Sequence, residues 1–419
     1  MKVLMFGWEF PPISSGGLGT ACYGLTKGLS NKGVEVTFVL PKGYSPDFAD
    51  HLNIVSAEGI RLKNVKFRPI KSPLRGYIDS AAYDEKIRNM LIKGWGGHNA
   101  TIYGNDLFDE VERYAEKAKI LAQHEDFDVI HAHDWMTFKA GANVKTSTGK
   151  PLVVHVHATE FDRTGGSPNQ HVYDIEREGM HAADMVIAVS NFTKNKIVQH
   201  YGVPAGKVRV VHNAVELSSQ AHFFNAGSGK NNGEKVVLFL GRVTLQKGPD
   251  YFLYAAKKVL DLDPRVKFII AGTGDMMPFL INKAAEMGIS KNVLFTGFVT
   301  GTDVDRAYRM ADLYVMPSVS EPFGITPLEA MRNGVPVLIS KQSGVSEVIS
   351  NCLKADFWDV NDLANKMMAA LNYQTMNRSL RENGSFEVRK FSWENSAEKC
   401  IAVYNEARQA SIGRGRGVA

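Results

Sequence analysis

Four histidines stand in two closely spaced pairs, each at the end of an apolar run. The first pair lies in the sequence HAHDW at 131–135, and the second lies in HVH at 155–157. Residues i and i+2 share one face of a β-strand, so the side chains of each pair can point together. Three interpretations stay open: hydrogen-bonded histidines at buried strand ends, a zinc or iron site completed by Asp134, and a polar floor on which Asp134 and His157 bind substrate hydroxyls.

Two cations follow another apolar run. Arg242 and Lys247 lie in the sequence GRVTLQKG at 241–248. A planar guanidinium and a compact ammonium on a glycine-bearing loop suit a diphosphate. The alternative is a pair of solvated surface cations at the start of a helix, which is disfavoured because positive charge there opposes the helix dipole. We therefore expect Arg242 and Lys247 to bind phosphate.

Two carboxylates are spaced eight positions apart in the sequence SEPFGITPLEA at 320–330. Glu321 is expected in a loop and Glu329 in the first turns of the helix that follows. Paired carboxylates can act as general acid and base, or they can bind vicinal hydroxyls. A helix-capping role is the alternative for Glu321, but Pro322 and Gly324 shape the backbone more than a cap requires.

A glycine-rich loop, SSGGLG at 14–19, follows the first apolar run. Glycines allow backbone N–H groups to face an anion, and a helix N-terminus adds a favourable dipole. A tight turn that requires positive φ is the alternative. The loop is not a dinucleotide fingerprint, because Cys22 occupies the position of the third glycine. It is not a Walker loop either, because no Gly-Lys-Ser/Thr sequence follows.

Short, continuous apolar runs alternate with stretches of helical length, which predicts doubly wound α/β units with parallel sheets. Strands are expected in the first half at 3–6, 34–40, 129–131, 152–157, 185–189 and 208–211, and in the second half at 236–240, 267–271, 293–296, 313–316 and 335–339. Helices are expected at 19–30, 106–122 and 191–201 among others.

The chain has 419 residues, more than one hydrophobic core usually supports. Turn residues at 225–233 separate the two series of strands. We therefore predict a first domain at 1–220, a linker at 221–234, a second domain at 235–385 and a C-terminal helix with a flexible tail at 386–419. Ligands of open parallel sheets bind beyond the carboxyl ends of the strands, so two such domains would face a cleft.

Composition narrows the class of protein. The net charge of +5 is too small to indicate a nucleic-acid-binding protein. Three cysteines, far apart, are typical of a reducing compartment rather than of a disulfide framework. The apolar run near Met1 is too short for a signal peptide, and no run reaches the roughly 20 residues of a membrane span. We expect a cytoplasmic protein without a transmembrane segment.

Taken together, these features resemble the retaining glycosyltransferases of family 4, and among them the glycogen and starch synthases. The resemblance spans nearly the whole chain and depends on five motifs in order: GGL at 16–18, HAHDW at 131–135, VH at 156–157, GR-x4-KG at 241–248 and E-x7-E at 321–329. It implies two Rossmann-like domains facing a cleft (the GT-B fold), no metal ion or other cofactor, and a final helix that crosses back to the first domain.

The resemblance also implies roles for individual residues. His157 and Asp134 would contact the sugar near the reacting carbon, and Arg242 and Lys247 would hold the donor diphosphate. Glu321 would then bind the hydroxyls of the donor sugar. The rest of the donor site would consist of Gly16, Gly17, Leu18, Gly324, Ile325 and Glu329, with Glu329 against the ribose and the glycines against the phosphates.

The implied reaction moves an α-glucosyl unit from ADP- or UDP-glucose to the non-reducing end of an α-1,4-glucan, with retention of configuration. A family 4 enzyme with a lipid-linked or small acceptor is the nearest alternative. A metal-dependent hydrolase built on the histidines and a sugar-binding protein are more distant ones. The synthases carry a lysine where this chain has Ser14, which leaves the donor nucleobase open.

Overall fold

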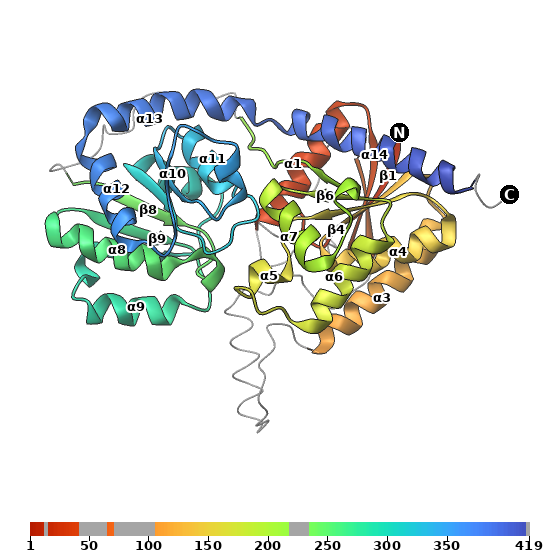
Figure 1. The fold of residues 1–419 in the computed structure, drawn as a ribbon, viewed down its shortest axis with the longest axis horizontal. Helices are drawn as coiled ribbons and strands as arrows, with labels where there is room; N and C mark the ends of the chain where they lie inside the picture. Colours follow the sequence, from red (N-terminus) through yellow and green to blue (C-terminus); the bar gives the residue numbers. More distant parts are fainter. Residues whose placement is uncertain (12–15, 42–64, 71–104, 218–233, 416–419) are drawn as a thin grey trace, which may run out of the picture. The chain divides into compact units, whose positions relative to one another are not determined.

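The computed structural model describes residues 1–11, 16–41, 65–70, 105–217 and 234–415 (Figure 1). The chain divides into two compact units. Unit 1 comprises Met1–Glu160, Pro168–Ala214 and Trp393–Ala419, and unit 2 comprises Phe161–Ser167 and Val215–Ser392. The end of the chain therefore returns to the unit that contains its beginning.

Unit 1 is built on a seven-stranded parallel sheet in the order β3-β2-β1-β4-β5-β6-β7. Its central strands are buried on both faces because helices cover both. Its strands are β1 (Lys2–Phe6), β2 (Glu35–Pro41), β3 (Val65–Ile70), β4 (Val129–His133), β5 (Leu152–Val156), β6 (Met185–Ala188) and β7 (Val208–Val210).

Two helices, α1 and α14, lie on one side of this sheet in Figure 1, and α3, α4 and α6 lie on the other. The helices of unit 1 are α1 (Gly17–Asn31), α3 (Asn105–Ala122), α4 (Trp135–Thr148), α6 (Gln170–Ala182), α7 (Asn191–Tyr201), the short η3 (Ala205–Lys207) and α14 (Trp393–Gly415). One further helix, α5 (Glu160–Arg163), begins at the last residue of a unit 1 segment.

Unit 2 repeats the plan with a six-stranded parallel sheet in the order β10-β9-β8-β11-β12-β13. Its core joins this sheet to α8 and α12 through side chains such as Phe239, Phe252 and Phe268. The strands are β8 (Val236–Leu240), β9 (Lys267–Ala271), β10 (Val293–Gly297), β11 (Leu313–Met316), β12 (Val337–Ser340) and β13 (Leu353–Ala355).

In Figure 1, α8 and α9 lie below the sheet of unit 2, and α10 and α11 lie above it. The α-helices are α8 (Pro249–Leu262), α9 (Met277–Glu286), α10 (Thr302–Met310), α11 (Thr326–Arg332), α12 (Val360–Asn372) and α13 (Gln374–Glu387). The short 3₁₀ helices are η5 (Leu245–Lys247), η6 (Ser290–Asn292), η7 (Gly344–Glu347) and η8 (Val388–Lys390).

The predicted class, two doubly wound parallel α/β units, is confirmed. Every strand expected from an apolar run is present, with ends shifted by up to two residues. Two ends shift by two residues. The strand β4 ends at His133 rather than at His131, and β12 begins at Val337 rather than at Val335, because Pro336 has no N–H to donate to a ladder. The apolar runs did not predict β3 and β13, since β3 carries Lys66 and Arg68 and β13 has only three residues.

In both sheets the order in which strands are added reverses at a switch point. The chain adds strands toward one edge of the sheet first and then toward the other edge. In unit 1 the switch point lies between β1 and β4, and in unit 2 it lies between β8 and β11. Open parallel sheets bind ligands beyond the carboxyl ends of the two strands at such a point. Of the five motifs, four begin at the carboxyl end of one of these strands or in the loop after it, and VH at 156–157 lies at the end of β5, next to β4.

Glycines on α1 allow α14 to pack closely against it. A Cβ atom at Gly24 would lie 2.0 Å from Cε2 of Trp393, and one at Gly28 would lie 2.4 Å from the Trp393 carbonyl oxygen. Both glycines are therefore required by packing, and they are not ligand-binding residues. This packing holds the last helix of the chain against the sheet of unit 1.

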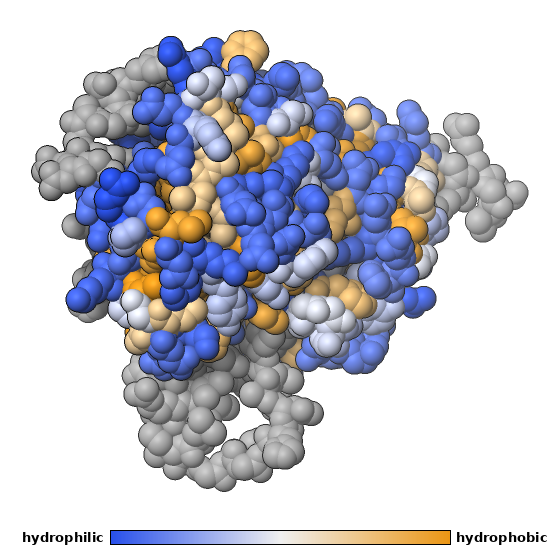
Figure 2. Space-filling view, turned by 60° about the vertical axis from the view of Figure 1, so that its left-hand side comes forward, coloured by the Kyte–Doolittle hydropathy of each residue, from blue (hydrophilic) through white to orange (hydrophobic). Residues whose placement is uncertain are grey.

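The face in Figure 2 is mostly hydrophilic, and its hydrophobic residues form separate patches. Exposed apolar side chains in unit 2 include Phe279, Leu294 and Phe298. Among the described residues, none of the helices combines the length and the apolar character needed to cross a bilayer.

Substitution of Gly28 by valine should lower the free energy of unfolding by about 1–3 kcal/mol, because the backbone of Trp393 leaves no room for a side chain. Urea unfolding followed by tryptophan fluorescence measures the change. Gly206→Ala is the control, since a Cβ there meets no described atom within 4 Å and should have little effect on stability. Equal stability of both variants would contradict the packing role assigned to Gly28.

Candidate active site

Four histidine rings stack at the carboxyl ends of β4 and β5. His133 and His155 are register partners on the two strands, and their ring centroids are 5.2 Å apart. His131 stacks on His155 at 5.4 Å with an angle of 7° between the planes, and His157 stacks on His155 at 4.2 Å. The i and i+2 spacing places the two rings of each pair together, as predicted, and the pairing of β4 with β5 brings the two pairs into one stack.

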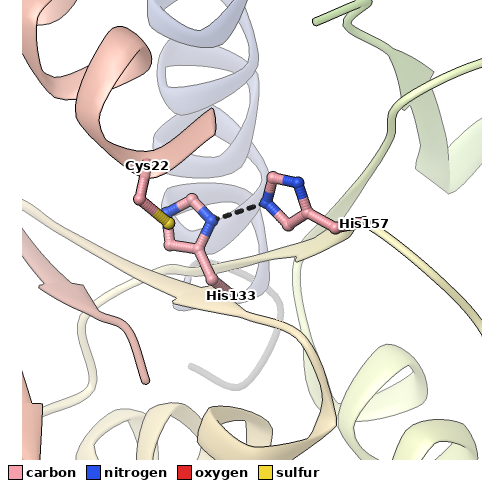
Figure 3. Close-up of side chains that lie close together, drawn as sticks. All are labelled: Cys22, His133 and His157. Carbon is pink, nitrogen blue, oxygen red and sulfur yellow. Dashed lines mark hydrogen bonds between the residues drawn. The ribbon is translucent and has the colours of Figure 1, made fainter. Parts of the chain in front are cut away.

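One hydrogen bond joins two of these rings. His133 Nδ1 and His157 Nε2 are 2.9 Å apart, and Figure 3 shows the two rings edge to edge with their nitrogens facing. The thiol of Cys22, from α1, lies beside the His133 ring in the same view. Burial raises the pKa of the Cys22 thiol well above its usual value, which keeps it protonated.

The stack is electrically neutral. Burial lowers the pKa of all four histidines, with a further lowering from neighbouring histidines at His131, His133 and His155, and brings that of His131 to about 3. At His157 burial lowers the pKa, and the negative charge of Asp134 offsets part of that lowering. His157 is therefore the ring on which a proton is best tolerated.

Asp134 holds the backbone that carries His157. Its Oδ1 accepts a hydrogen bond of 2.7 Å from the His157 N–H and a longer one from the Ala158 N–H. Asp134 is buried and has a φ of 56°, the only non-glycine in the described chain with positive φ. A strained backbone at a strand end is a feature of functional sites. The structure thus brings together Asp134 and His157, the two residues predicted to bind the sugar in unit 1.

Two groups in this cluster have the composition of metal-ligand sets. They are Cys22, His133 and His157, and His131, His133 and His155, each with candidate ligand atoms within 4.8 Å of one another. Ligand nitrogens on one zinc ion lie roughly 3.3 Å apart, and their lone pairs converge. In the second group the angles between the ring planes are 7° to 33°. The nitrogen lone pairs of nearly parallel rings do not converge on one point. In the first group, the two nitrogens that face each other share a hydrogen bond. The geometry fits a hydrogen-bonded stack better than a chelate.

Tyr404 is a member of this cluster that the sequence did not predict. Its hydroxyl lies 2.8 Å from Nδ1 of His131, although the two residues are 273 positions apart in the chain. Tyr404 is fully buried on α14. No spacing rule links a helix near the end of the chain to a strand in its first third, so only the fold reveals the contact.

In unit 2, the predicted cation and carboxylate form an ion pair across the switch point. Lys247, after β8, donates to Oε2 of Glu321, after β11, at 2.5 Å. Ser318 Oγ donates to the same oxygen at 3.3 Å. Glu321 is buried, and the helix that follows has Ile325 at its cap without a side-chain bond. Glu321 therefore does not cap the helix, and the capping alternative is wrong.

Arg242 remains exposed beside this pair and is oriented by Gln246. Its Nη2 donates to Oε1 of Gln246 at 3.1 Å, and Nε2 of Gln246 donates to the Ser320 carbonyl at 3.1 Å. Gln246 thus ties the loop after β8 to the loop after β11. The sequence analysis did not single out Gln246, although its place between Arg242 and Lys247 was a usable signal.

Glu329 and Glu321 have different hydrogen-bond partners. The Oε2 atom of Glu329 accepts a 2.9 Å hydrogen bond from the Tyr308 hydroxyl. Burial raises the pKa of Glu329, and the bond from Tyr308 and the charge of Arg332 work in the opposite direction. Between the two carboxylates, Gly324 has a φ of 101°, which only glycine adopts readily. The two carboxylates thus have separate partners, which is consistent with separate roles rather than an acid–base pair.

Gly17, the first residue of α1, has neither a positive φ nor a close neighbour that would require glycine. Gly16 precedes the helix with a φ of −69°, and a Cβ at Gly17 would meet no described atom within 4 Å. Gly16 and Gly17 are exposed and Leu18 is partly exposed. The positive-φ alternative is therefore wrong for Gly16 and Gly17, whereas Ser14 lies outside the described residues.

Two family models match the chain. The model described as "Glycosyltransferase Family 4" matches residues 97–219, and the one described as "Glycosyl transferases group 1" matches residues 221–385. An uncharacterised glycosyltransferase of Methanocaldococcus jannaschii is 32% identical over 425 residues, which cover 98% of this chain and 99% of that protein. The chain belongs to glycosyltransferase family 4.

This glycosyltransferase is also similar to the glycogen synthase of Mycobacterium tuberculosis, with 25% identity over 98% of this chain and 95% of that protein. Among solved structures, sucrose-phosphate synthase from Thermosynechococcus elongatus matches with a TM-score of 0.73 and 20% identity, over 97% of this chain and 98% of that one. The expected GT-B fold class and the assignment as a transferase enzyme are confirmed.

The neutral histidine stack should make this glycosyltransferase sensitive to acid. Histidines in the unfolded chain bind protons below a pH of about 6.5, whereas those in the stack have lowered pKa values, so stability is present above that pH and is lost as the pH falls. Each such histidine should contribute a slope of up to about 1.4 kcal/mol per pH unit.

Urea unfolding at pH 8, 6 and 5 measures this slope. The variant His155→Phe keeps an aromatic ring in the stack and removes one titrating group, so its free energy of unfolding should fall less steeply with acid than that of the wild type. Parallel slopes for the two proteins would show that His155 is not held neutral by the fold.

Proposed function

We propose that this enzyme transfers an α-glucosyl unit from ADP- or UDP-glucose to the non-reducing end of an α-1,4-glucan, with retention of configuration. The similarity to a glycogen synthase over 98% of the chain supports the glucan acceptor. The five motifs of the synthases, in order along the chain, support the same assignment. The two switch points, with these motifs at their strand ends, support a sugar-nucleotide ligand.

The observation that carries the proposal is the charge arrangement at the switch point of unit 2. When the bond between the sugar and the diphosphate breaks, negative charge grows on the leaving phosphate. Fixed cations stabilise that charge more in the transition state than in the ground state. Arg242 is held by Gln246 and Lys247 is held by Glu321, so both cations are oriented before a donor binds.

Glu321 is proposed to bind hydroxyls of the donor sugar. Its carboxylate accepts both of its described hydrogen bonds at one oxygen, Oε2. An ammonium has three N–H donors, so the bond from Lys247 to Glu321 is compatible with further bonds to phosphate oxygens. Lys247 would therefore bind the diphosphate while it also holds Glu321, the residue proposed to bind the sugar.

Backbone N–H groups are also proposed to contribute to donor binding. Gly17 is the first residue of α1, so its N–H has no acceptor within the helix. The N–H groups of Gly24 and its neighbours are used by the helix itself. The space around Gly17 supports a close approach of phosphate oxygens to this helix N-terminus. Gly324 and Ile325, just before α11, would present their N–H groups in the same way, and Glu329 would bind the ribose.

Asp134 and His157 are proposed to hold the sugar near the reacting carbon in unit 1. A carboxylate and a neutral imidazole can both bind hydroxyls, and neither has to act as a covalent nucleophile. In the proposed reaction the leaving phosphate assists the acceptor hydroxyl on the same face of the sugar. No metal ion or other cofactor is part of this proposal.

Incubation with ADP-glucose or UDP-glucose, with and without glycogen, tests the proposal by release of the nucleoside diphosphate. Release that depends on glycogen and persists with EDTA is the expected result. Release that depends instead on a small sugar phosphate or a lipid-linked acceptor would replace the glucan assignment. No release with either donor and any of these acceptors would overturn the assignment of a glucosyl donor.

Removal of either cation should slow the reaction without unfolding unit 2. Arg242→Ala and Lys247→Ala are each expected to lower kcat on the order of 10²-fold, because each removes a fixed charge from the leaving phosphate. Steady-state kinetics of nucleotide release measure the loss.

Lys283→Ala is the matched control. Lys283 is a partly exposed lysine of unit 2 whose ammonium also pairs with a glutamate, Glu286 at 2.9 Å on the surface of α9. Its removal should leave kcat within about twofold, since an exposed pair contributes little. A similar loss in all three variants would indicate a general effect of charge, and not a role in the site.

A further inference from the structure

The bond between His133 and His157 restricts what His157 can offer to a ligand. An imidazole has two nitrogens, and Nε2 of His157 lies 2.9 Å from Nδ1 of His133. Because Nε2 is engaged by a buried neighbour, Nδ1, which is buried without a hydrogen-bond partner among the described residues, is the ring nitrogen of His157 left for a sugar hydroxyl.

We propose that His133 is a positioning residue for His157, which couples the tautomer of His157 to its own and fixes the ring orientation in which His157 Nδ1 meets the hydroxyl of the donor sugar. The proposal rests on the proposed function for the identity of the ligand. The fixing of the ring by His133 is independent of that function and is a property of unit 1 alone.

Two neutral rings that share one hydrogen bond have linked tautomers. If His133 donates from Nδ1, His157 accepts at Nε2 and carries its own proton on Nδ1. If His157 donates from Nε2, its Nδ1 is an acceptor. In both arrangements the bond ties one tautomer of His157 to one tautomer of His133. Without a partner at Nε2, the ring of His157 could also turn over and exchange the places of nitrogen and carbon.

The other contacts of His157 do not distinguish its nitrogens. His155 stacks on the ring at 4.2 Å with 21° between the planes, which restricts the plane of the ring and not the identity of the atoms at its edge. Asp134 accepts from the backbone N–H of His157 and so places the residue rather than the ring. The bond of His131 is made to Tyr404. Among the described contacts, the hydrogen bond shared with His133 is the one that selects a nitrogen.

Three substitutions separate positioning from packing. His133→Phe keeps a stacked ring and removes the hydrogen bond. His133→Asn restores a polar group near the place of Nδ1. His155→Phe is the matched control, because His155 is equally buried and stacked and has no hydrogen-bond partner at either ring nitrogen among the described residues. Thermal unfolding identifies any variant that does not fold. If His133→Phe does not fold, His133→Asn still tests the proposal.

The kinetic expectation is a selective loss of turnover. His133→Phe should lower kcat about 10- to 100-fold, since a misplaced group at the reacting centre has effects of this size. The KM for the donor should change less than about threefold, because the cations and carboxylates assigned to the nucleotide lie in unit 2. His133→Asn should recover part of the loss, and His155→Phe should retain kcat within about threefold. Equal losses for His133→Phe and His155→Phe would overturn the proposal.

The spectroscopic test needs no substrate. Nitrogen-15 NMR of the ring-labelled protein reports the tautomer of each histidine, and the signals of His157 are those that disappear in His157→Gln. His133→Phe should shift the ring-nitrogen signals of His157, because Nε2 loses its hydrogen-bond partner and the tautomer of His157 is no longer coupled to that of His133. Unchanged His157 signals in His133→Phe would overturn the proposal. If the wild type transfers no sugar, the proposed function fails, and this spectrum alone decides the role of His133.

Discussion

The burial of two parallel sheets on both faces is the constraint on which the rest of the structure depends. A parallel strand covered by helices on each side leaves polar groups only at its ends, because elsewhere they would be buried without partners. The residues assigned to chemistry accordingly lie at or after the carboxyl ends of β1, β4, β5, β8 and β11, or in the helices that follow. The switch point in each sheet then determines which loops are neighbours.

The polar groups at the strand ends differ in charge between the two units. Unit 1 buries four histidines, and burial keeps them neutral. Unit 2 holds cations in place with a buried carboxylate and a glutamine, through Glu321 and Gln246. Neutral donors and acceptors suit the hydroxyls of a sugar, and fixed cations suit a diphosphate. The contrast between the units therefore matches the two chemical parts of a nucleotide sugar.

Apolar runs predicted the strands well because a doubly covered strand must be continuously hydrophobic. The same rule could not find β3, which carries charged residues at the edge of the sheet. Spacing predicted that the histidines of each pair would meet, since i and i+2 share a face, but not that the two pairs would form one stack. It did not predict the ion pair between Lys247 and Glu321. Contacts between distant segments, such as Tyr404 with His131 and Gln246 with Ser320, depend on the path of the whole chain and have no local signal.

The central claim is that the enzyme moves glucose from a nucleotide with its configuration retained. Proton NMR of a mixture of the enzyme, an α-linked nucleotide glucose and a maltooligosaccharide tests this claim most directly, because it resolves the anomeric signals of donor and product as the reaction proceeds. The account predicts that the donor signal declines while a new α-1,4 signal grows in equal amount. A β-linked product, or a donor signal converted only to free glucose, would contradict it.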